Sequence, residues 1–191
     1  MSDVAVRPTD RPAGWWGMAL FVATEATLFG TIFGTYVYLR SQSVEWPPPG
    51  TPEPKALWPL LLTASLVATS FPLRGALRSV RAGHAGRARA ATLLALLVQT
   101  GYLAAQLTLF AHDLDLFPPD TSAYASIYFT MLGAHAAHVA AGILLELWLL
   151  VRLAGGLTRY RLVAVQVTVF YWVCVNVLAA ITLAVQLSPR L

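Results

Sequence analysis

Five long apolar stretches constrain this chain more than any other feature of its sequence. They cover residues 15–39, 56–78, 90–111, 123–151 and 162–187. At about 1.5 Å per residue, a helix of roughly 20 residues crosses the ~30 Å hydrocarbon layer of a bilayer, and each stretch reaches that length. A strand barrel would instead show short segments of alternating polarity. The sequence therefore predicts an all-α, polytopic membrane protein whose five transmembrane helices form one domain over residues 1–191.

Charge is scarce in this chain and falls on alternate connections between the stretches. Only 12% of its 191 residues are charged, against roughly 25% in soluble domains. Basic residues precede the first stretch and fill the second and fourth connections: Arg7, Arg11, Arg74, Arg78, Arg81, Arg87, Arg89, Arg152, Arg159 and Arg161. Acidic residues occupy the other connections: Glu45, Glu53, Asp113, Asp115 and Asp120. Because basic loops stay in the cytoplasm, this alternation predicts a cytoplasmic N-terminus and an external C-terminus.

The net charge of +4 is thus explained by membrane orientation and by contact with anionic lipid head groups. We expect no nucleic-acid partner. All but one of the basic residues are Arg, and Ala and Leu are abundant, as in GC-rich coding sequences. This composition favours the inner membrane of a prokaryotic cell. The single cysteine, Cys174, lies in the last stretch and excludes a disulfide framework or a thiolate metal cluster.

Glu25 lies about ten residues into the first apolar stretch, near the expected middle of the bilayer. An ionisable side chain at that depth costs roughly 3 kcal/mol on insertion scales unless it has a partner or a wet cavity. We therefore expect the side of the first helix that carries Glu25 to be enclosed by protein.

The fourth stretch places His135, His138, Gly142 and Glu146 on one side of a helix. At about 100° per residue, these four positions fall within an arc of about 80°. Acyl chains offer such an arc no hydrogen bonds, so it must face protein or water. His138 has the same expected depth as Glu25, and the two would pair if their helices are neighbours. Glu146 lies nearer the cytoplasmic surface and is expected to approach the interface.

Three interpretations fit the buried polar cluster of Glu25, His135, His138 and Glu146. It could fix the register of packed helices, it could line a crevice that binds lipid head groups or relays protons, or it could ligate a metal or haem. A bis-histidine haem would need a facing histidine at matching depth, but the remaining histidines, His84 and His112, lie in opposite connections. Residue spacing alone leaves the three interpretations open.

Small residues indicate close packing between helices. Gly30 and Gly34 lie four residues apart on the first helix, so they share one face. Gly133 begins a similar row on the fourth helix, which also carries Gly142. These rows predict a helical bundle, and they do not indicate an activity.

Two motifs resemble subunit III of the haem–copper respiratory oxidases. The run WWGMALFVATEATLFG is similar to the family pattern W-G-M-x-x-F-x-x-x-E-x-x-x-F-G at Trp16, Gly17, Met18, Phe21, Glu25, Phe29 and Gly30. The run GAHAAHVAAG resembles T-G-x-H-G-x-H-V-x-x-G at Gly133, His135, His138, Val139 and Gly142. The resemblance covers the whole chain, in the five-helix form of the family that lacks two N-terminal helices.

The chain departs from the family pattern in its last helix. Family members carry Y-W-H-F-V-D there, whereas this sequence has Tyr171 and Trp172 followed by Val173 in place of the histidine and Asn176 in place of the aspartate. These replacements mark a divergent branch and put in doubt the contacts that the last helix makes.

The resemblance implies a subunit that has no active site and binds neither haem nor copper. Those cofactors are expected in partner subunits, with oxygen reduction in subunit I, and subunits I and II are the expected partners. It also implies a V-shaped cleft that holds phospholipid, with Glu25 as the family's buried carboxylate and His135 and His138 on the helix that lines the cleft.

We therefore predict the non-catalytic subunit III of a proton-pumping terminal oxidase of aerobic respiration. Such a subunit would stabilise the catalytic subunit, bind lipid in a cleft and support proton uptake. One alternative is a related accessory protein of a nitric oxide reductase. Another, from a different class, is a small proton-coupled transporter, although inverted repeats and broken helices are not evident in the sequence.

Overall fold

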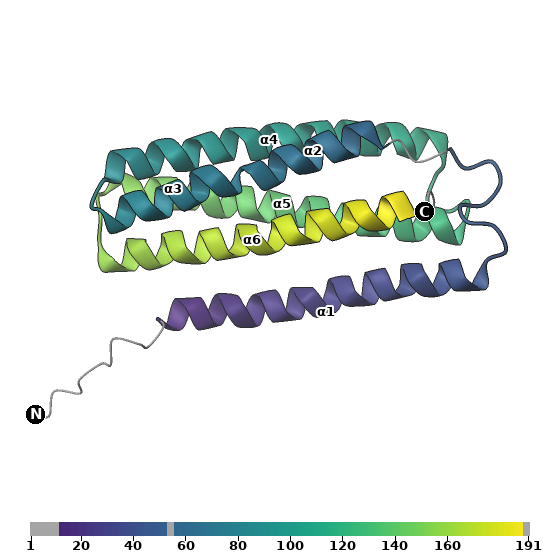
Figure 1. Ribbon diagram of the computed structural model, residues 1–191, viewed down its shortest axis with the longest axis horizontal. Coiled ribbons are helices and arrows are strands. Elements are labelled where there is room, and N and C mark those ends of the chain that lie inside the picture. Colours follow the sequence, from purple (N-terminus) through teal and green to yellow (C-terminus); the bar gives the residue numbers. More distant parts are fainter. Residues whose placement is uncertain (1–11, 53–55, 189–191) are drawn as a thin grey trace, which may run out of the picture.

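The structure, a computed structural model, describes residues 12–52 and 56–188 and is helical throughout, with no strand in these ranges (Figure 1). Its helices are α1 (Ala13–Gln42), α2 (Leu57–Ala68), α3 (Ser70–Arg81), α4 (Ala85–Leu116), α5 (Ala123–Ala154) and α6 (Arg159–Leu187). By length and hydropathy α1, α4, α5 and α6 each suffice to cross a bilayer, and α2 and α3 make a fifth crossing together. The predicted fold class is confirmed. The predictions for Arg7, Arg11 and Glu53 fall outside the described residues.

The helices extend beyond the apolar stretches that predicted them. Hydropathy marks where a helix crosses hydrocarbon, whereas its backbone hydrogen bonds continue into the interface. Asp113 and Asp115, which the sequence placed in a connection, lie near the end of α4 for this reason. Ser122 caps the start of α5, because its side chain accepts a hydrogen bond from the backbone amide of Ala125.

The second crossing is interrupted at Thr69, which separates α2 from α3. Pro72 has no amide hydrogen, so the carbonyl of Ala68 loses the hydrogen bond that a regular helix would give it. At the same point the backbone amide of Thr69 donates to the carbonyl of Leu66, three residues earlier, at 3.1 Å. This turn is tighter than a turn of a regular α-helix. Thr69 is almost fully buried. The break therefore places polar groups inside the bundle at this depth.

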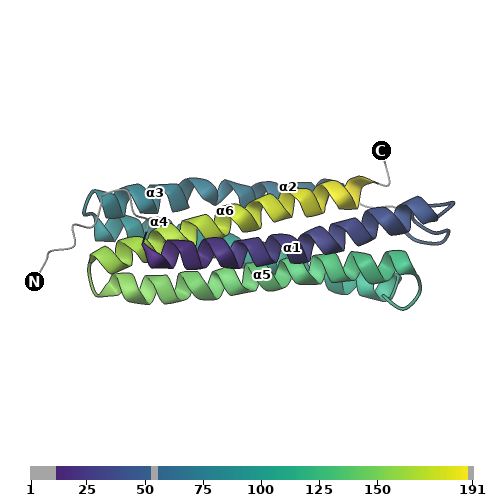
Figure 2. The same cartoon turned by 90° about the horizontal axis from the view of Figure 1, so that it is seen from below.

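Helix α1 stands apart from the other helices. It contacts only α5 and α6, whereas α3, α4, α5 and α6 form a closed ring in which each helix contacts two of the others. Figure 1 shows α1 displaced from the remaining helices along its whole length, and Figure 2 shows it running beside α5 and α6. Only 11% of the most apolar part of α1 is buried within the chain, against 44% for α6. The bundle therefore has a compact part, α2 to α6, and a loosely attached helix.

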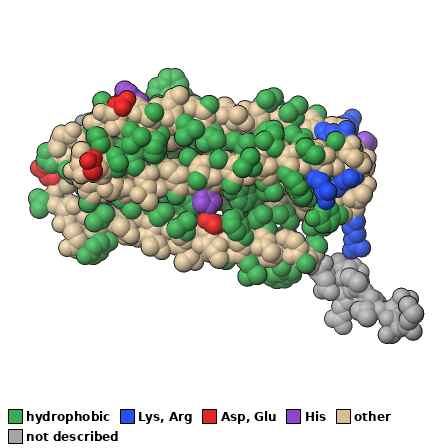
Figure 3. Space-filling view, turned by 180° about the vertical axis from the view of Figure 1, so that it is seen from behind, with side chains coloured by type: hydrophobic (Ala, Val, Ile, Leu, Met, Phe, Trp, Pro, Cys, Tyr) green, Lys and Arg blue, Asp and Glu red, His purple; other side chains and the backbone are tan. Residues whose placement is uncertain are grey.

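Basic and acidic side chains gather at opposite ends of the bundle (Figure 3). At the arginine end, the turns from α3 to α4 and from α5 to α6, Arg89 donates to the carbonyl oxygens of Leu153 and Ala154. Arg161 donates to the carbonyl oxygens of Gly155 and Gly156. Arg89 thus donates to the last carbonyls of α5, and Arg161 donates to those of the turn that follows it. The opposite end, where α1 and α4 terminate, carries the acids and is called the acidic end below.

Candidate functional site

The strongest polar contact between helices joins Glu25 of α1 to His138 of α5. Oε2 of Glu25 lies 2.6 Å from Nε2 of His138, and both side chains are mostly buried, at 19% and 15% exposed. Nδ1 of His138 lies 2.7 Å from the backbone carbonyl of Ala134. The structure thus brings together two residues of the predicted polar cluster that are far apart in the sequence.

The hydrogen bonds of His138 fix the net charge of this pair. A carbonyl oxygen can only accept, so Nδ1 carries a proton and donates it to Ala134. The proton shared with Glu25 then sits either on the carboxyl group, beside a neutral imidazole, or on Nε2, beside a carboxylate. Both arrangements have zero net charge. A pair of this kind tolerates a low-dielectric environment without a further counter-ion, and its proton can change sides without altering the net charge of the pair.

Aromatic groups hold His138 in place. The Phe29 ring meets the imidazole edge-on at a centroid distance of 5.1 Å. The hydroxyl of Tyr171 on α6 donates to the backbone carbonyl of His138 at 2.7 Å. Three helices, α1, α5 and α6, therefore converge on the pair.

A crevice of about 380 Å³ opens beside the pair, between α1 and α6. Glu25 and His138 form part of its wall. The rest is almost entirely apolar and includes Phe21, Phe33, Val173, Cys174, Leu178 and Ile181. Figure 3 shows an acid and a histidine in contact midway along a face whose other charged side chains lie towards its two ends. Val173, which replaces the histidine of the family pattern, therefore adds to the apolar wall of this crevice.

Glu146 lies in a different environment. It is 0% exposed and sits beside Gln99 of α4, yet neither of its carboxyl oxygens has a hydrogen-bond partner among the described residues. Helices α4 and α6 pack against α5, and the expectation that Glu146 approaches the membrane interface stays a prediction. Glu146 is enclosed by protein and has no base beside it.

A cluster of amides and hydroxyls lies at the break between α2 and α3, and Gln99, which lies beside Glu146, belongs to it. The side-chain amide of Gln99 donates to Oγ1 of Thr69 at 3.3 Å, and Thr69 donates to the carbonyl of Leu66. The amide of Asn176 on α6 donates to Oγ of Ser70 at 2.8 Å. Asn176, which departs from the family pattern, thus links α6 to the helix break.

His135 lies apart from the Glu25–His138 pair. Its Nε2 lies 3.2 Å from the hydroxyl of Tyr102 on α4, and Nδ1 has no partner among the described residues. The side chains of the predicted arc therefore point to two neighbours. His138 turns towards α1, whereas His135 and Glu146 turn towards α4.

Gly142 packs against two aromatic rings of α6. A Cβ atom at this position would lie 2.6 Å from the Trp172 ring and 2.9 Å from the Tyr171 ring. At Gly30, Gly34 and Gly133, a Cβ atom would meet nothing within 4 Å. Of these four glycines, Gly142 is therefore the one that permits close packing of helices inside this chain, and open space surrounds the other three.

Sequence reasoning missed Gln99, Thr69 and Tyr102. A glutamine within an apolar stretch was a usable signal, because a buried amide needs partners just as a buried acid does. Thr69 gave no such signal, since a threonine can satisfy its hydroxyl within its own helix. Within the described ranges, no three His, Cys, Asp or Glu side chains come close enough to share a metal ion.

Known proteins share this sequence pattern over nearly its whole length. The sequence model of the family described as cytochrome c oxidase subunit III matches residues 12–186. The chain is 28% identical to cytochrome c oxidase subunit 3 of Synechocystis, over 85% of this chain and 70% of that protein. It is 31% identical to cytochrome bo(3) ubiquinol oxidase subunit 3 of Pseudomonas aeruginosa, over 76% and 67%. Quinol oxidase subunit 3 of Bacillus subtilis is 27% identical, over 83% and 77%.

Proposed function

The chain belongs to the cytochrome c oxidase subunit III family, a family of haem–copper oxidase subunits, and from that premise we propose that it is a non-catalytic scaffold in a proton-pumping oxidase. It stabilises the catalytic subunit, holds phospholipid between α1 and α6, and supports proton uptake. Haem and copper belong to the partner subunits I and II. The resemblance drawn from two sequence motifs is confirmed by the family match over residues 12–186.

The observation that carries this proposal is the hydrogen-bonded pair of Glu25 and His138 in the wall of an apolar crevice. A crevice at mid-membrane depth, walled by apolar side chains, suits an acyl chain and not a polar substrate. The pair joins α1 to α5 without adding charge to that wall. This supports a role in holding helices and lipid in a fixed arrangement.

The distribution of charge supports the orientation. Arg81, Arg87 and Arg161 lie at one end of the bundle, and Glu45 and Asp120 lie at the other. By the positive-inside rule, the arginine end faces the cytoplasm and the acidic end faces outward. The N-terminal end of α1 is then cytoplasmic and the end of α6 is external. Bacterial relatives fit a prokaryotic inner membrane.

The test compares the assembled oxidase carrying Glu25→Gln with the wild-type oxidase. Glutamine keeps the size of the side chain and removes its ionisable carboxyl group, so we expect normal assembly, nearly unchanged initial oxygen consumption and an altered duration of turnover. Loss of initial activity in a complex that still contains every subunit would mean that Glu25 takes part in the chemistry, and the scaffold proposal would fail. Val22→Ile, a conservative change in the crevice wall, serves as the control.

A further inference from the structure

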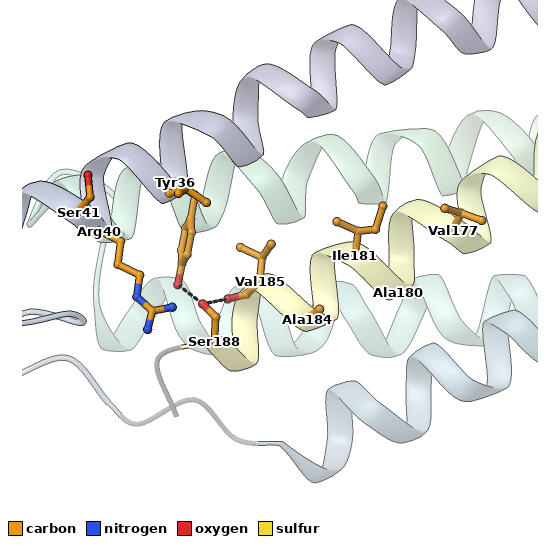
Figure 4. A pocket seen from close by; sticks show the side chains of 10 residues that line it. Tyr36, Arg40, Ser41, Val177, Ala180, Ile181, Ala184, Val185 and Ser188 are labelled. Atoms are coloured by element: carbon orange, nitrogen blue, oxygen red, sulfur yellow. Dashed lines mark hydrogen bonds between the residues drawn. The ribbon is translucent and has the colours of Figure 1, made fainter. Parts of the chain in front are cut away.

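Two further hollows lie towards the acidic end of the bundle. The larger, of about 850 Å³, is a mostly apolar groove between α1 and α6, and Figure 4 shows Tyr36 and Arg40 on its α1 side. Val177 and Ile181 line both this groove and the crevice, so the groove belongs to the lipid-holding role proposed above. The smaller hollow is separate, because no residue in its lining borders the groove or the crevice.

The smaller hollow has a volume of about 70 Å³ and lies where α2 and α5 begin and where α4 and α6 end. Aromatic rings form much of its wall, and we call it the aromatic pocket after Trp58, Phe117, Tyr124 and Tyr128. The centroid of the Phe117 ring lies 5.4 Å from that of Tyr128 and 6.4 Å from that of Tyr124. The face of an aromatic ring is electron-rich and attracts cations.

Asp113 of α4 contributes a negative charge to the same wall. Its Oδ2 atom accepts a hydrogen bond from the hydroxyl of Tyr128 at 2.8 Å, which leaves the charge in place. Within the described ranges, Asp113 forms no ion pair with a basic side chain. It also lies in the last turn of α4, where the helix dipole disfavours an acid and favours a cation, and that turn contains no basic residue. A cation in the pocket would therefore stabilise Asp113.

Two glutamines in the wall add further hydrogen-bond acceptors. The side-chain nitrogen of Gln186 donates to the hydroxyl of Tyr128 at 3.4 Å, so its carbonyl oxygen is the atom left for a ligand. The side chain of Gln106 makes no hydrogen bond with any residue that the structure describes. Together with the Asp113 carboxylate, the wall offers three groups that accept hydrogen bonds. A primary ammonium group carries three N–H donors, which matches this number.

The size of the pocket selects the head of a ligand and not a whole molecule. A water molecule takes up about 30 Å³ in the liquid, so a volume of about 70 Å³ holds roughly two groups of that size. An ammonium group and the methylene that carries it fit this space, whereas a planar guanidinium is larger. A metal ion is a poorer match, because no three His, Cys, Asp or Glu side chains in the described part of the chain come close enough to share one.

We propose that the aromatic pocket binds one primary ammonium group, supplied by a lysine side chain of a partner subunit or by a free alkylamine. The Asp113 carboxylate pairs with the ammonium, and the carbonyl oxygens of Gln106 and Gln186 accept its other protons. The rings of Phe117 and Tyr124 contact the adjoining methylene. This site goes beyond the lipid-holding role and does not depend on it.

The experiment measures the binding of butylammonium chloride by isothermal titration calorimetry, to the purified full chain and to the assembled oxidase. His112 also lines the pocket, so the titration runs at about pH 8, where histidine is ordinarily neutral. Butylammonium is expected to bind with one-to-one stoichiometry to the purified chain. Tetramethylammonium chloride, which has the same charge and no N–H donor, should bind much more weakly.

Variants of the wall test the assigned contacts. Asp113→Asn keeps the size of the side chain and an acceptor for Tyr128 but removes the charge, so the dissociation constant is expected to rise about tenfold. Asp115→Asn, the same change at an exposed acid of α4 outside the pocket, is the control. Gln106→Leu removes one acceptor that has no partner within the chain, and it should raise the dissociation constant about fivefold.

The source of the ammonium group follows from comparing the chain with the complex. A partner lysine in the pocket would abolish butylammonium binding in the assembled oxidase, whereas a site for free amines would bind it equally in both. Unchanged affinity in Asp113→Asn overturns the proposal, and so does an equal loss in Asp115→Asn or equal binding of tetramethylammonium. Binding that appears only in the double variant Lys55→Gln/Arg190→Gln, two basic residues outside the described ranges, would mean that this chain fills its own pocket, and the proposal would fail.

Discussion

Glu25 and Glu146 both lie within membrane-spanning helices, yet they are accommodated in opposite ways. Glu25 borders an apolar crevice and is paired with the base His138 at 2.6 Å. Glu146 has no base beside it and is 0% exposed, enclosed within the bundle beside the amide of Gln99. Glu25 has a basic partner, so it can lie in the wall of an open crevice. Glu146 is kept from both lipid and water by tight packing.

The two acids lie in different parts of the bundle. The Glu25 pair is the link between loosely attached α1 and α5, whereas Glu146 lies inside the compact part that α3, α4, α5 and α6 form. A hydrogen-bonded pair can hold two loosely packed helices together, because it depends on only two side chains. Enclosure needs every surrounding helix to stay in place. Substitutions should therefore act differently in the two regions, and the free energy of unfolding of the purified chain, from titration with a denaturing detergent, can measure this.

The largest loss is expected from Gly142→Val, which lies on α5 between His138 and Glu146. Its side chain would collide with the rings of Trp172 and Tyr171, so α6 would have to move away from both regions. Overpacking of this kind lowers the free energy of unfolding by about 3 kcal/mol. Gly133→Val, on the same helix but with open space around the position, is the control. Equal losses from the two variants would show that the α5–α6 contact is not critical.

His138→Leu should have the next largest effect, because it leaves Glu25 beside the crevice without its base. Loss of the partner of a charged or acidic group costs about 2 kcal/mol. The double variant Glu25→Leu/His138→Leu should recover part of that loss, since neither polar group remains unpaired. A double-mutant cycle with no coupling between the two positions would remove the basis for the pair.

Gln99→Leu tests the enclosed region. It deletes the amide that donates to Thr69 and lies beside Glu146, so we expect a loss of about 1 kcal/mol. Val98→Leu, at the neighbouring position on α4, provides the control. No change in Gln99→Leu would mean that packing alone stabilises the helix break.

Glu146→Met should have the smallest effect, within about 1 kcal/mol in either direction. The carboxyl group has no hydrogen-bond partner among the described residues, and methionine fills a similar volume with an apolar side chain. Glu25→Met should lose clearly more, because it leaves the imidazole of His138 unpaired. If Glu146→Met proves the more damaging of the two, the contrast between the two acids is wrong.

The sequence predicted the elements of the site better than their arrangement. The depth of Glu25 and the position of His138 followed from helix length, and both residues lie in the contact that joins α1 to α5. Helix periodicity predicted that His135, His138 and Glu146 lie on one side of their helix, away from lipid. It could not predict that these side chains face two different helices. Side chains within about 80° of one another can still point to different helices, because each helix in a bundle touches several others.

What the sequence alone determined was the set of helices and the number of crossings, because hydrophobic length and backbone hydrogen bonding in lipid leave one solution for such segments. It also placed Glu25 in the middle of the first helix. The tertiary structure decided which acid received a base, where the second crossing breaks, and that Arg40 faces an apolar groove. These outcomes depend on contacts between helices far apart in the chain, and helix periodicity does not specify which helices become neighbours.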